Sequence, residues 1–193
     1  MNNLILKVIN LSVDYTSNNS LLFPWEKTNI FRAVEDINFE ISEGETLGIV
    51  GETGSGKSTI AKAIVNILKV SSGKIFFQSN QISNLDEKNM RPFRKEIQMI
   101  FQDPLASLNP RMNVGEIISE PLKTHYPNLG INEIKMQVQD IMENVGLLPN
   151  QINRYPHEFS GGQCQRIGIA RSLILKPKLI ICDEPVSALD VSI

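Results

Sequence analysis

A glycine-rich segment, GETGSGKST at residues 51–59, constrains this chain more than any other feature of its sequence. The segment fits the pattern G-x-x-x-x-G-K-[ST], whose glycines let backbone N–H groups wrap around phosphate oxygens without side-chain clashes. The run Glu45–Val50 before it predicts a strand, and the apolar positions of 60–68 after it recur at helical spacing. A strand, a glycine loop and a helix in this order predict an α/β fold whose helix directs its positive end at a bound anion.

The side chains of this segment also suit a nucleoside triphosphate. Lys57 places an ammonium where it neutralises the β- and γ-phosphates, and Ser58 offers a hydroxyl to Mg²⁺. The segment therefore predicts binding of ATP or GTP together with Mg²⁺. The residues predicted to bind the nucleotide here are Gly51, Glu52, Thr53, Gly54, Ser55, Gly56, Lys57, Ser58 and Thr59.

Two consecutive carboxylates follow a predicted buried strand near the end of the sequence. The strand is predicted over 178–182, KLIIC, and Asp183 and Glu184 come directly after it. A nucleotide hydrolase needs a carboxylate that holds the metal through water and a group that polarises the attacking water. We predict these roles for Asp183 and Glu184 respectively, although an apolar run followed by two acids, taken alone, also fits an ordinary strand end.

A third motif, FSGGQ at residues 159–163, opens a helix predicted over 161–176. Ser160 is the expected cap, and a serine followed by two glycines makes a second helix start that suits an anion. A plain helix cap explains the same residues. At this motif the sequence resembles the ABC ATPase family, whose signature motif is LSGGQ and differs only in its first residue.

The resemblance implies a dimeric mechanism. In that family two subunits sandwich two ATP molecules, and the phosphate loop of one subunit faces the signature helix of the other. By this resemblance Ser160, Gly161, Gly162 and Gln163 contact the γ-phosphate bound by a partner subunit. Hydrolysis then requires dimerisation.

Further landmarks of the family occur in the expected order. Gln102 in FQDP matches the glutamine loop, which touches Mg²⁺ and joins a helical insertion to the core. Asp190 in SALD matches the loop that contacts the opposite subunit. Tyr15 matches the aromatic residue that stacks on adenine, although an ordinary strand tyrosine fits equally well. The resemblance thus implies catalytic roles for Glu184, Gln102 and Lys57, and a metal site formed by Ser58, Gln102 and Asp183.

The expected fold is an α/β P-loop ABC ATPase core with a mainly parallel sheet, an N-terminal antiparallel β part and a helical insertion subdomain. One domain is expected over residues 1–193. Its predicted parts are a β-rich phosphate-loop core at 1–101, the helical insertion at 102–165 and a core segment with the carboxylate strand at 166–193. Strands are predicted over the opening LILKVINLSVDY and over 33–41, with a loop at 17–30 between them.

Within the insertion, one apolar stripe predicts a single helix face. Asn132 is expected to cap the start of this helix and Gly146 to end it. Packing into a core is the ordinary role of such a stripe. Its members are Ile131, Ile134, Val138, Ile141, Met142 and Val145.

Three long strings narrow the resemblance to the ATPase subunits of oligopeptide and dipeptide importers: FQDPLASLNPRMNVGEIISEPL, RYPHEFSGGQCQRIGIAR and CDEPVSALDVSI. This likeness covers essentially the whole chain. It implies that ATP hydrolysis powers the import of peptides or related solutes. The implied partners are a second, identical or sister ATPase subunit, integral membrane permease subunits and, indirectly, an external solute-binding protein. The implied location is the cytoplasmic face of the membrane.

Two other functions stay open at this point. A non-transport ABC ATPase acts on DNA or ribosomes, but the 19 basic and 21 acidic residues give a net charge of −2 and no basic stripe, so no nucleic-acid partner is expected. A nucleotide-binding fragment without turnover is the other alternative. The apolar runs are too short to cross a bilayer, and the N-terminus lacks the features of a signal peptide.

The chain departs from the family pattern in two places. Cys164 stands where those subunits usually have Arg, in a first helical turn that favours a thiolate, although a neutral replacement fits as well. The sequence also ends at Ile193, before the strand that bears the family's switch histidine, and His125 and His157 both precede the signature. The chain is therefore expected to be truncated. Cys164 and Cys182 have no metal-ligand spacing, so reduced thiols and no zinc site are expected.

A truncated core predicts poor behaviour in solution. Missing strands leave a sheet edge and apolar surface uncovered, so this polypeptide by itself should aggregate. Size-exclusion chromatography and thermal melting test this expectation, and a monodisperse preparation that melts cooperatively would refute it.

Overall fold

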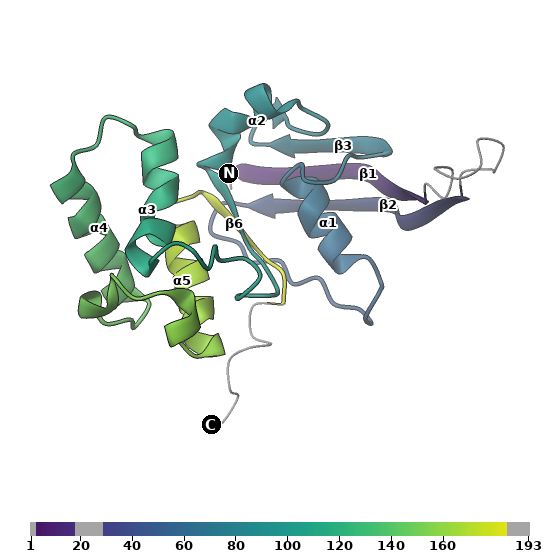
Figure 1. The fold of residues 1–193 in the computed structure, drawn as a ribbon. Coiled ribbons are helices and arrows are strands. Elements are labelled where there is room, and N and C mark those ends of the chain that lie inside the picture. Colours follow the sequence, from purple (N-terminus) through teal and green to yellow (C-terminus); the bar gives the residue numbers. More distant parts are fainter. Residues whose placement is uncertain (1–2, 18–28, 185–193) are drawn as a thin grey trace, which may run out of the picture. The chain divides into compact units, whose positions relative to one another are not determined.

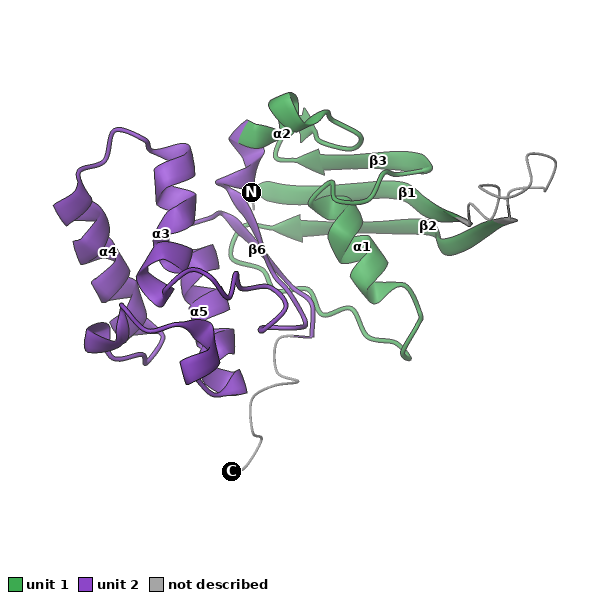
Figure 2. Cartoon of the chain, viewed as in Figure 1, with its two compact units in different colours: residues 1–91 green, residues 92–193 purple. Residues whose placement is uncertain are grey.

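The computed structural model describes residues 3–17 and 29–184. The chain divides into two compact units, residues 1–91 and residues 92–193 (Figure 2). Each unit has its own sheet, and Figure 1 labels the helices α1 to α5 and the strands β1, β2, β3 and β6. Most of the predicted loop at 17–30 lies outside the described residues, and the predicted limits of the parts of the domain stay a prediction.

The first unit contains an antiparallel sheet with the strand order β2-β1-β3-β4. Alternating apolar residues turn one face of the sheet inward, as the sequence pattern predicted. The predicted N-terminal antiparallel part is therefore confirmed. The strands are β1 (Leu4–Ser17), β2 (Asn29–Ser42), β3 (Ser72–Phe77) and β4 (Asn80–Gln81). The largest fully buried side chains of this core include Leu6, Leu11, Ile75, Phe77 and Ile82.

Helix α1 (Lys57–Ile64) packs against β1 and β2 (Figure 1). The sequence predicted apolar helical spacing as far as residue 68, but the helix ends at Ile64. Asn66 has a positive φ of 57°, and the N–H groups of Ile67 and Leu68 both donate to the carbonyl of Lys62. These turn hydrogen bonds close the helix before the apolar run is complete.

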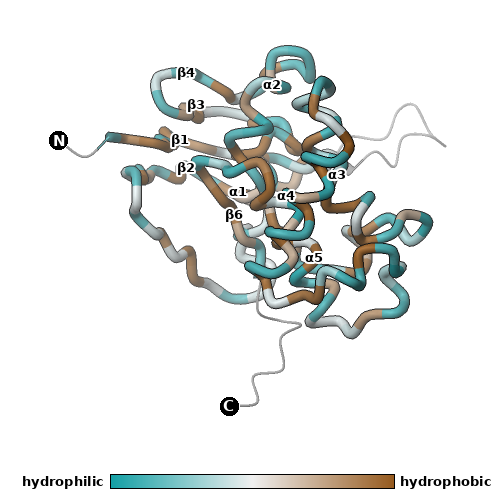
Figure 3. The backbone as a smooth tube through the Cα atoms, turned by 90° about the vertical axis from the view of Figure 1, so that its left-hand side faces the viewer, coloured by the Kyte–Doolittle hydropathy of each residue, from teal (hydrophilic) through white to brown (hydrophobic). Residues whose placement is uncertain are grey.

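The connector between β2 and α1 corrects one prediction. Residues 45–50 were expected to form a strand, but they form none in the structure. A strand needs a neighbour for its N–H and C=O groups, and among the described residues no strand pairs with this segment. The connector contains several hydrophobic residues, drawn brown in Figure 3. One of them, Val50, is 93% exposed.

The second unit contains a parallel pair of strands, β5 (Ile97–Ile100) and β6 (Leu179–Cys182). Ile97 pairs with Leu179 and Ile100 with Cys182, so the two strands end at the same edge. The strand predicted over 178–182 is confirmed as β6, but its predicted burial is wrong, because only Leu179 is buried and Ile180 and Cys182 are exposed. In the described part of the chain this pair is the whole of the parallel sheet, although a mainly parallel sheet was expected.

Three helices form the core of the second unit: α3 (Val114–His125), α4 (Ile131–Asn144) and α5 (Gly161–Leu173). Helix α3 packs against α4 and α5, and α5 also packs against β5. The second unit also contains the 3₁₀ turns η2 (Pro149–Gln151) and η3 (Pro156–Glu158), whereas α2 (Glu87–Arg94) begins in the first unit and ends in the second. None of the helices in the described part of the chain combines the length and apolar character that a membrane crossing requires.

The apolar stripe of α4 is confirmed in most positions and wrong in one. Val138 and Met142 are buried in the helical core and Ile134, Ile141 and Val145 pack against it, whereas Ile131, the first helical residue, is 85% exposed. The N-cap is Gly130, so the predicted cap at Asn132 is wrong. Gly146 ends the helix with a φ of 75°, as predicted.

Replacing Ile167 with Ala tests the packing of this helical core. Ile167 is fully buried in α5, so Ile167→Ala should lower the free energy of unfolding by about 2–5 kcal/mol. The matched control is Ile131→Ala on the exposed start of α4, which should change it by less than about 0.5 kcal/mol. Urea denaturation followed by circular dichroism measures both. Equal effects of the two changes would contradict this assignment of the core.

Candidate functional site

The glycine loop at residues 51–59 contains a turn that requires glycine at its last glycine position, Gly56. Gly54 and Gly56 have φ values of 84° and 95°, in the region that side chains rarely adopt. A Cβ at residue 56 would lie 2.7 Å from the carbonyl oxygen of Ala33 and 3.0 Å from a methyl group of Val34, both in β2. The loop therefore starts α1 from a backbone held tightly against the sheet.

Lys57 covers this loop with its ammonium group. Its Nζ donates to the carbonyl oxygens of Gly51 and Glu52 at 2.9 and 2.8 Å. The first turn of α1 contains no acidic residue, so no carboxylate of that turn neutralises the positive end of the helix. An ammonium group, main-chain amides and a helix N-terminus thus meet at one point, which suits a bound polyanion.

Tyr15 lies beside the start of the same helix. Its hydroxyl is 3.2 Å from Oγ1 of Thr59 in the first turn of α1, and the residue is 41% exposed. The structure therefore brings together the two parts of the predicted site in the first unit, which are Tyr15 and the glycine loop. Thr59 fixes the position of the Tyr15 hydroxyl, while part of the Tyr15 side chain is exposed.

The second unit gathers the predicted glutamine and carboxylates. The main-chain N–H of Asp183 donates to the carbonyl of Ile100 at 3.0 Å, so the pairing with β5 extends one residue past the end of β6. Asp183 is buried and Glu184 is exposed. The amide nitrogen of Gln102 donates to Oε2 of Glu184 at 2.5 Å. The parallel pair therefore sets Gln102, Asp183 and Glu184 at one edge.

Helix α5 begins with the predicted cap. Oγ of Ser160 accepts a hydrogen bond from the main-chain N–H of Gln163 at 3.3 Å, and Oε1 of Gln163 accepts one from the N–H of Ser160 at 3.0 Å. This reciprocal capping box satisfies both N–H groups. The amides of Gly161 and Gly162 have no carbonyl four residues earlier in the helix, so they are the donors that an anion at this terminus would use.

Cys164 corrects another expectation. Its side chain is fully buried, and its Sγ donates to the carbonyl of Pro156 at 3.4 Å. Burial raises the pKa of the Cys164 thiol. The neutral thiol is therefore the stable form, and the predicted preference for a thiolate is wrong because burial outweighs the helix terminus.

Buried polar residues farther along α5 had no distinct motif in the sequence. Arg171 donates to the carbonyl of Ser107 at 2.7 Å, and burial lowers the pKa of its guanidinium group. Arg171 is half-buried, whereas Gln165 and Ser172 are fully buried. Helical spacing places Gln165, Gly168 and Ser172 on one face of α5. The sequence alone does not show that this face is the packed one, so the spacing could not identify these residues in advance.

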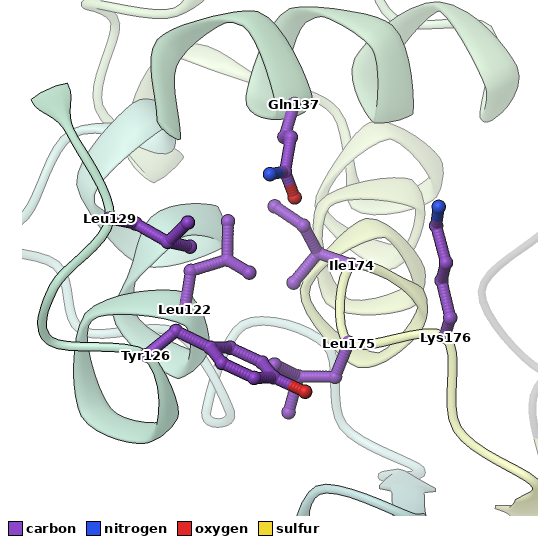
Figure 4. Close-up of a pocket in the computed structure, with 7 residues that line it drawn as sticks. All are labelled: Leu122, Tyr126, Leu129, Gln137, Ile174, Leu175 and Lys176. Atoms are coloured by element: carbon purple, nitrogen blue, oxygen red, sulfur yellow. The ribbon is translucent and has the colours of Figure 1, made fainter. Parts of the chain in front are cut away.

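A small cavity of about 210 Å³ lies in the helical part of the second unit (Figure 4). Gln137 points into it from α4 toward Ile174, and Tyr126 closes its lower side in the view of Figure 4. None of the predicted site residues lines it; the lining residues are Leu122, Tyr126, Leu129, Gln137, Ile174, Leu175 and Lys176.

The predicted site residues thus form two groups. Tyr15 and the loop at 51–59 lie in the first unit, and Gln102, Asp183, Glu184 and the residues at 160–163 lie in the second. Asp190 lies outside the described residues. Their assembly around one nucleotide stays a prediction.

The family follows from a comparison with known proteins. Residues 34–187 match the family model described as ABC transporter. The chain belongs to the ABC transporter family. The match spans the glycine loop, the capped helix α5 and the carboxylates at the end of β6.

Relatives with a described role are similar over nearly the whole chain. The oligopeptide transport ATP-binding protein OppF of Haemophilus influenzae is 57% identical over 190 residues, which cover 98% of this chain and 57% of that protein. OppF of Salmonella typhimurium is 54% identical over 189 residues, with coverage of 98% and 57%. The chain therefore spans between half and two thirds of the length of these curated relatives.

Two solved structures share the fold. The dimeric ATP-binding cassette MJ0796 in a post-hydrolysis state, bound to ADP and Pi, has a TM-score of 0.85 and 28% identity over 97% of this chain and 77% of that chain. A second dimeric structure, described as a bacterial ABC transporter cassette, has a TM-score of 0.83 and 28% identity over 96% and 76%. The predicted ABC ATPase fold is confirmed.

Replacing Gly56 with Ala tests the constraint on the loop. The added Cβ meets the Ala33 carbonyl in a left-handed backbone conformation, so Gly56→Ala should lower the free energy of unfolding by at least about 1–2 kcal/mol. Gly48→Ala is the control, since a Cβ there has open space and no positive φ; its effect should stay below about 0.5 kcal/mol. Chemical denaturation measures both, and a Gly56→Ala protein as stable as the control would contradict the geometry.

Proposed function

We propose that this chain binds MgATP and hydrolyses it to power peptide import as part of the motor subunit of an ABC transporter. The observation that carries the proposal is the glycine loop, in which Lys57 lies over the carbonyls of Gly51 and Glu52 at the start of α1. The similarity to proteins described as oligopeptide transport ATP-binding proteins supports the choice of peptides as cargo.

In this proposal the first unit binds the nucleotide. The amides of 51–59 and the ammonium of Lys57 bind the phosphates, because they combine full and partial positive charges in a loop without side-chain obstruction. Lys57 has three N–H donors, so a phosphate oxygen can replace the carbonyls that it now contacts. The outer part of Tyr15 stacks on the adenine while Thr59 holds its hydroxyl.

The residues proposed for Mg²⁺ fit that ion. Ser58, Gln102 and Asp183 all offer oxygen atoms, which hard cations prefer. Because the amide nitrogen of Gln102 donates to Glu184, its amide oxygen is the atom left to face a cation. Within the described residues no group of three His, Cys, Asp or Glu residues could hold a metal ion by itself. Bound Mg²⁺ would neutralise phosphate charge during transfer.

Glu184 is the proposed general base. Its carboxylate accepts the hydrogen bond from Gln102, which orients it at the edge where β5 and β6 end. A carboxylate held in this way is suited to take a proton from an attacking water. Asp183, buried beside it, provides the charge on the metal side.

Hydrolysis in this proposal needs a second ATPase subunit. Ser160, Gly161, Gly162 and Gln163 would contact the γ-phosphate held by the partner, and Asp190 would contact that partner as well. The capped start of α5 supports this role, because it directs first-turn amides outward. The dimeric state of the similar cassette MJ0796 also supports it.

The remaining partners follow from the transport role. Integral membrane permease subunits would hold the chain at the cytoplasmic face of the membrane, and an external solute-binding protein would deliver the peptide. ATP-driven dimer closure would move the permease subunits through the helical part of the chain. The name of the relative OppF supports a transport role for the whole protein, of which the chain spans a part.

Replacing Glu184 with Gln in the full-length subunit tests the mechanism. Glu184→Gln removes the base but keeps an uncharged side chain of the same shape, so ATP binding should persist while turnover falls by about 100-fold or more. ATP-bound dimers should accumulate. Phosphate release, calorimetry and light scattering measure the three effects.

Lys57→Ala serves as the control that removes binding itself. Unchanged turnover in Glu184→Gln would exclude Glu184 as the base. Absence of heat when ATP is titrated into the unaltered protein would overturn the proposed function as a whole.

A further inference from the structure

Gln165, in the second turn of α5, is the least explained polar side chain of the second unit. The residue is 1% exposed, and within the described residues neither its amide oxygen nor its amide nitrogen has a hydrogen-bond partner. A buried polar group left unpaired costs about 1–3 kcal/mol, and an apolar side chain of similar shape avoids that cost. An amide at this position therefore indicates a state of the protein in which it is paired.

The contacts of α5 show what the amide faces. Oγ of Ser172, two turns later on the same helix face, donates to the carbonyl of Met99 in β5 at 3.3 Å. Gly168, between them on that face, has Oγ of Ser107 4.0 Å from the position of a Cβ. The face that carries Gln165 is therefore turned toward β5 and the loop 102–107 that follows it.

The level of Gln165 along the strand follows from helix and strand geometry. Helix α5 leads through a short connection into β6, which is parallel to β5, so α5 runs opposite to both strands. Gln165 precedes Ser172 by about 10 Å along the helix axis. The same distance covers roughly three residues of an extended strand, which leads from Met99 to Gln102. Gln165 thus lies at the level of Gln102.

We infer that Gln165 is a positioning residue for hydrolysis, whose buried amide holds the loop 102–107 in the ATP-bound arrangement. This inference rests on the proposed function. The amide offers two N–H donors and an oxygen acceptor, so it can pair with both kinds of main-chain group in the loop. Gln102 in turn donates to Glu184. Gln165 therefore acts on the base through Gln102.

The other end of the same loop is already attached to α5. Arg171 donates to the carbonyl of Ser107, and Oγ of Ser107 donates to the carbonyl of Pro104. Gln165 lies toward the Gln102 end, one helical turn after Ser160. A nucleotide bound at Ser160 and the base at Glu184 are thus linked through a single helix and a single loop.

Gln165→Met in the full chain separates positioning from packing. Met fills a similar volume without polar atoms, so the melting temperature should stay equal or rise. The dissociation constant for ATP should stay within about twofold, while kcat falls about 10- to 100-fold, as a base displaced by about 1 Å predicts. The matched control is Gln137→Met on α4, outside the site, which should leave kcat, ATP affinity and melting temperature unchanged.

Gln165→Glu gives an independent test if the Met variant does not fold. A protonated carboxyl keeps one donor and one acceptor, whereas an ionised one has lost its donor. Relative to the unaltered protein, kcat of Gln165→Glu should therefore fall as pH rises. If the ratio of kcat in Gln165→Glu to kcat in the unaltered protein does not change with pH, the inference is contradicted.

The other possible outcomes overturn either the inference about Gln165 or the proposed function. Unchanged kcat in Gln165→Met overturns the inference, and so does a parallel loss of kcat and melting temperature, which indicates a structural role only. Failure of the unaltered protein to bind ATP overturns the proposed function instead, and calorimetry identifies that case separately.

Discussion

The close approach of Gly56 to the carbonyl of Ala33 is the contact on which the first unit depends. Because the backbone passes within reach of that oxygen with a positive φ, the glycine loop is held against β2 at the point where α1 begins. The Lys57 ammonium and the N-terminus of α1 then lie at the same place, over the carbonyls of Gly51 and Glu52. Tyr15 joins them because β1 pairs with β2 and ends beside Thr59.

The second unit solves a different problem, which is to bring together residues far apart in sequence. Gln102 and Glu184 meet because β5 and β6 pair in parallel with Ile100 opposite Cys182. A shift of that register by one residue would turn the buried and exposed faces of β6 over and separate the pair. Helix α5 runs opposite to the strands, which places its capped N-terminus toward the same edge as the carboxylates.

Polar side chains on α5, half-buried or buried, tie this arrangement together. Arg171 and Ser172 are paired with main-chain carbonyls of Ser107 and Met99, and Gln165 is placed to extend the series toward Gln102. Such groups cost free energy when unpaired and specify one arrangement when paired. We therefore propose that the helix packs into the core with one face and aligns the site with another.

The sequence by itself determined whatever depends on short-range chemistry. The glycine loop, the Ser160 cap and the carboxylates after the KLIIC strand were identifiable because their function needs fixed residue types at fixed spacing. Tertiary structure decided the rest. Residues 45–50 are not a strand since the described chain offers them no neighbour, and Cys164 is a neutral thiol since packing buries it. The pairing of Gln102 with Glu184 and the unpaired amide of Gln165 depend on how helix and strands pack, which no local pattern encodes.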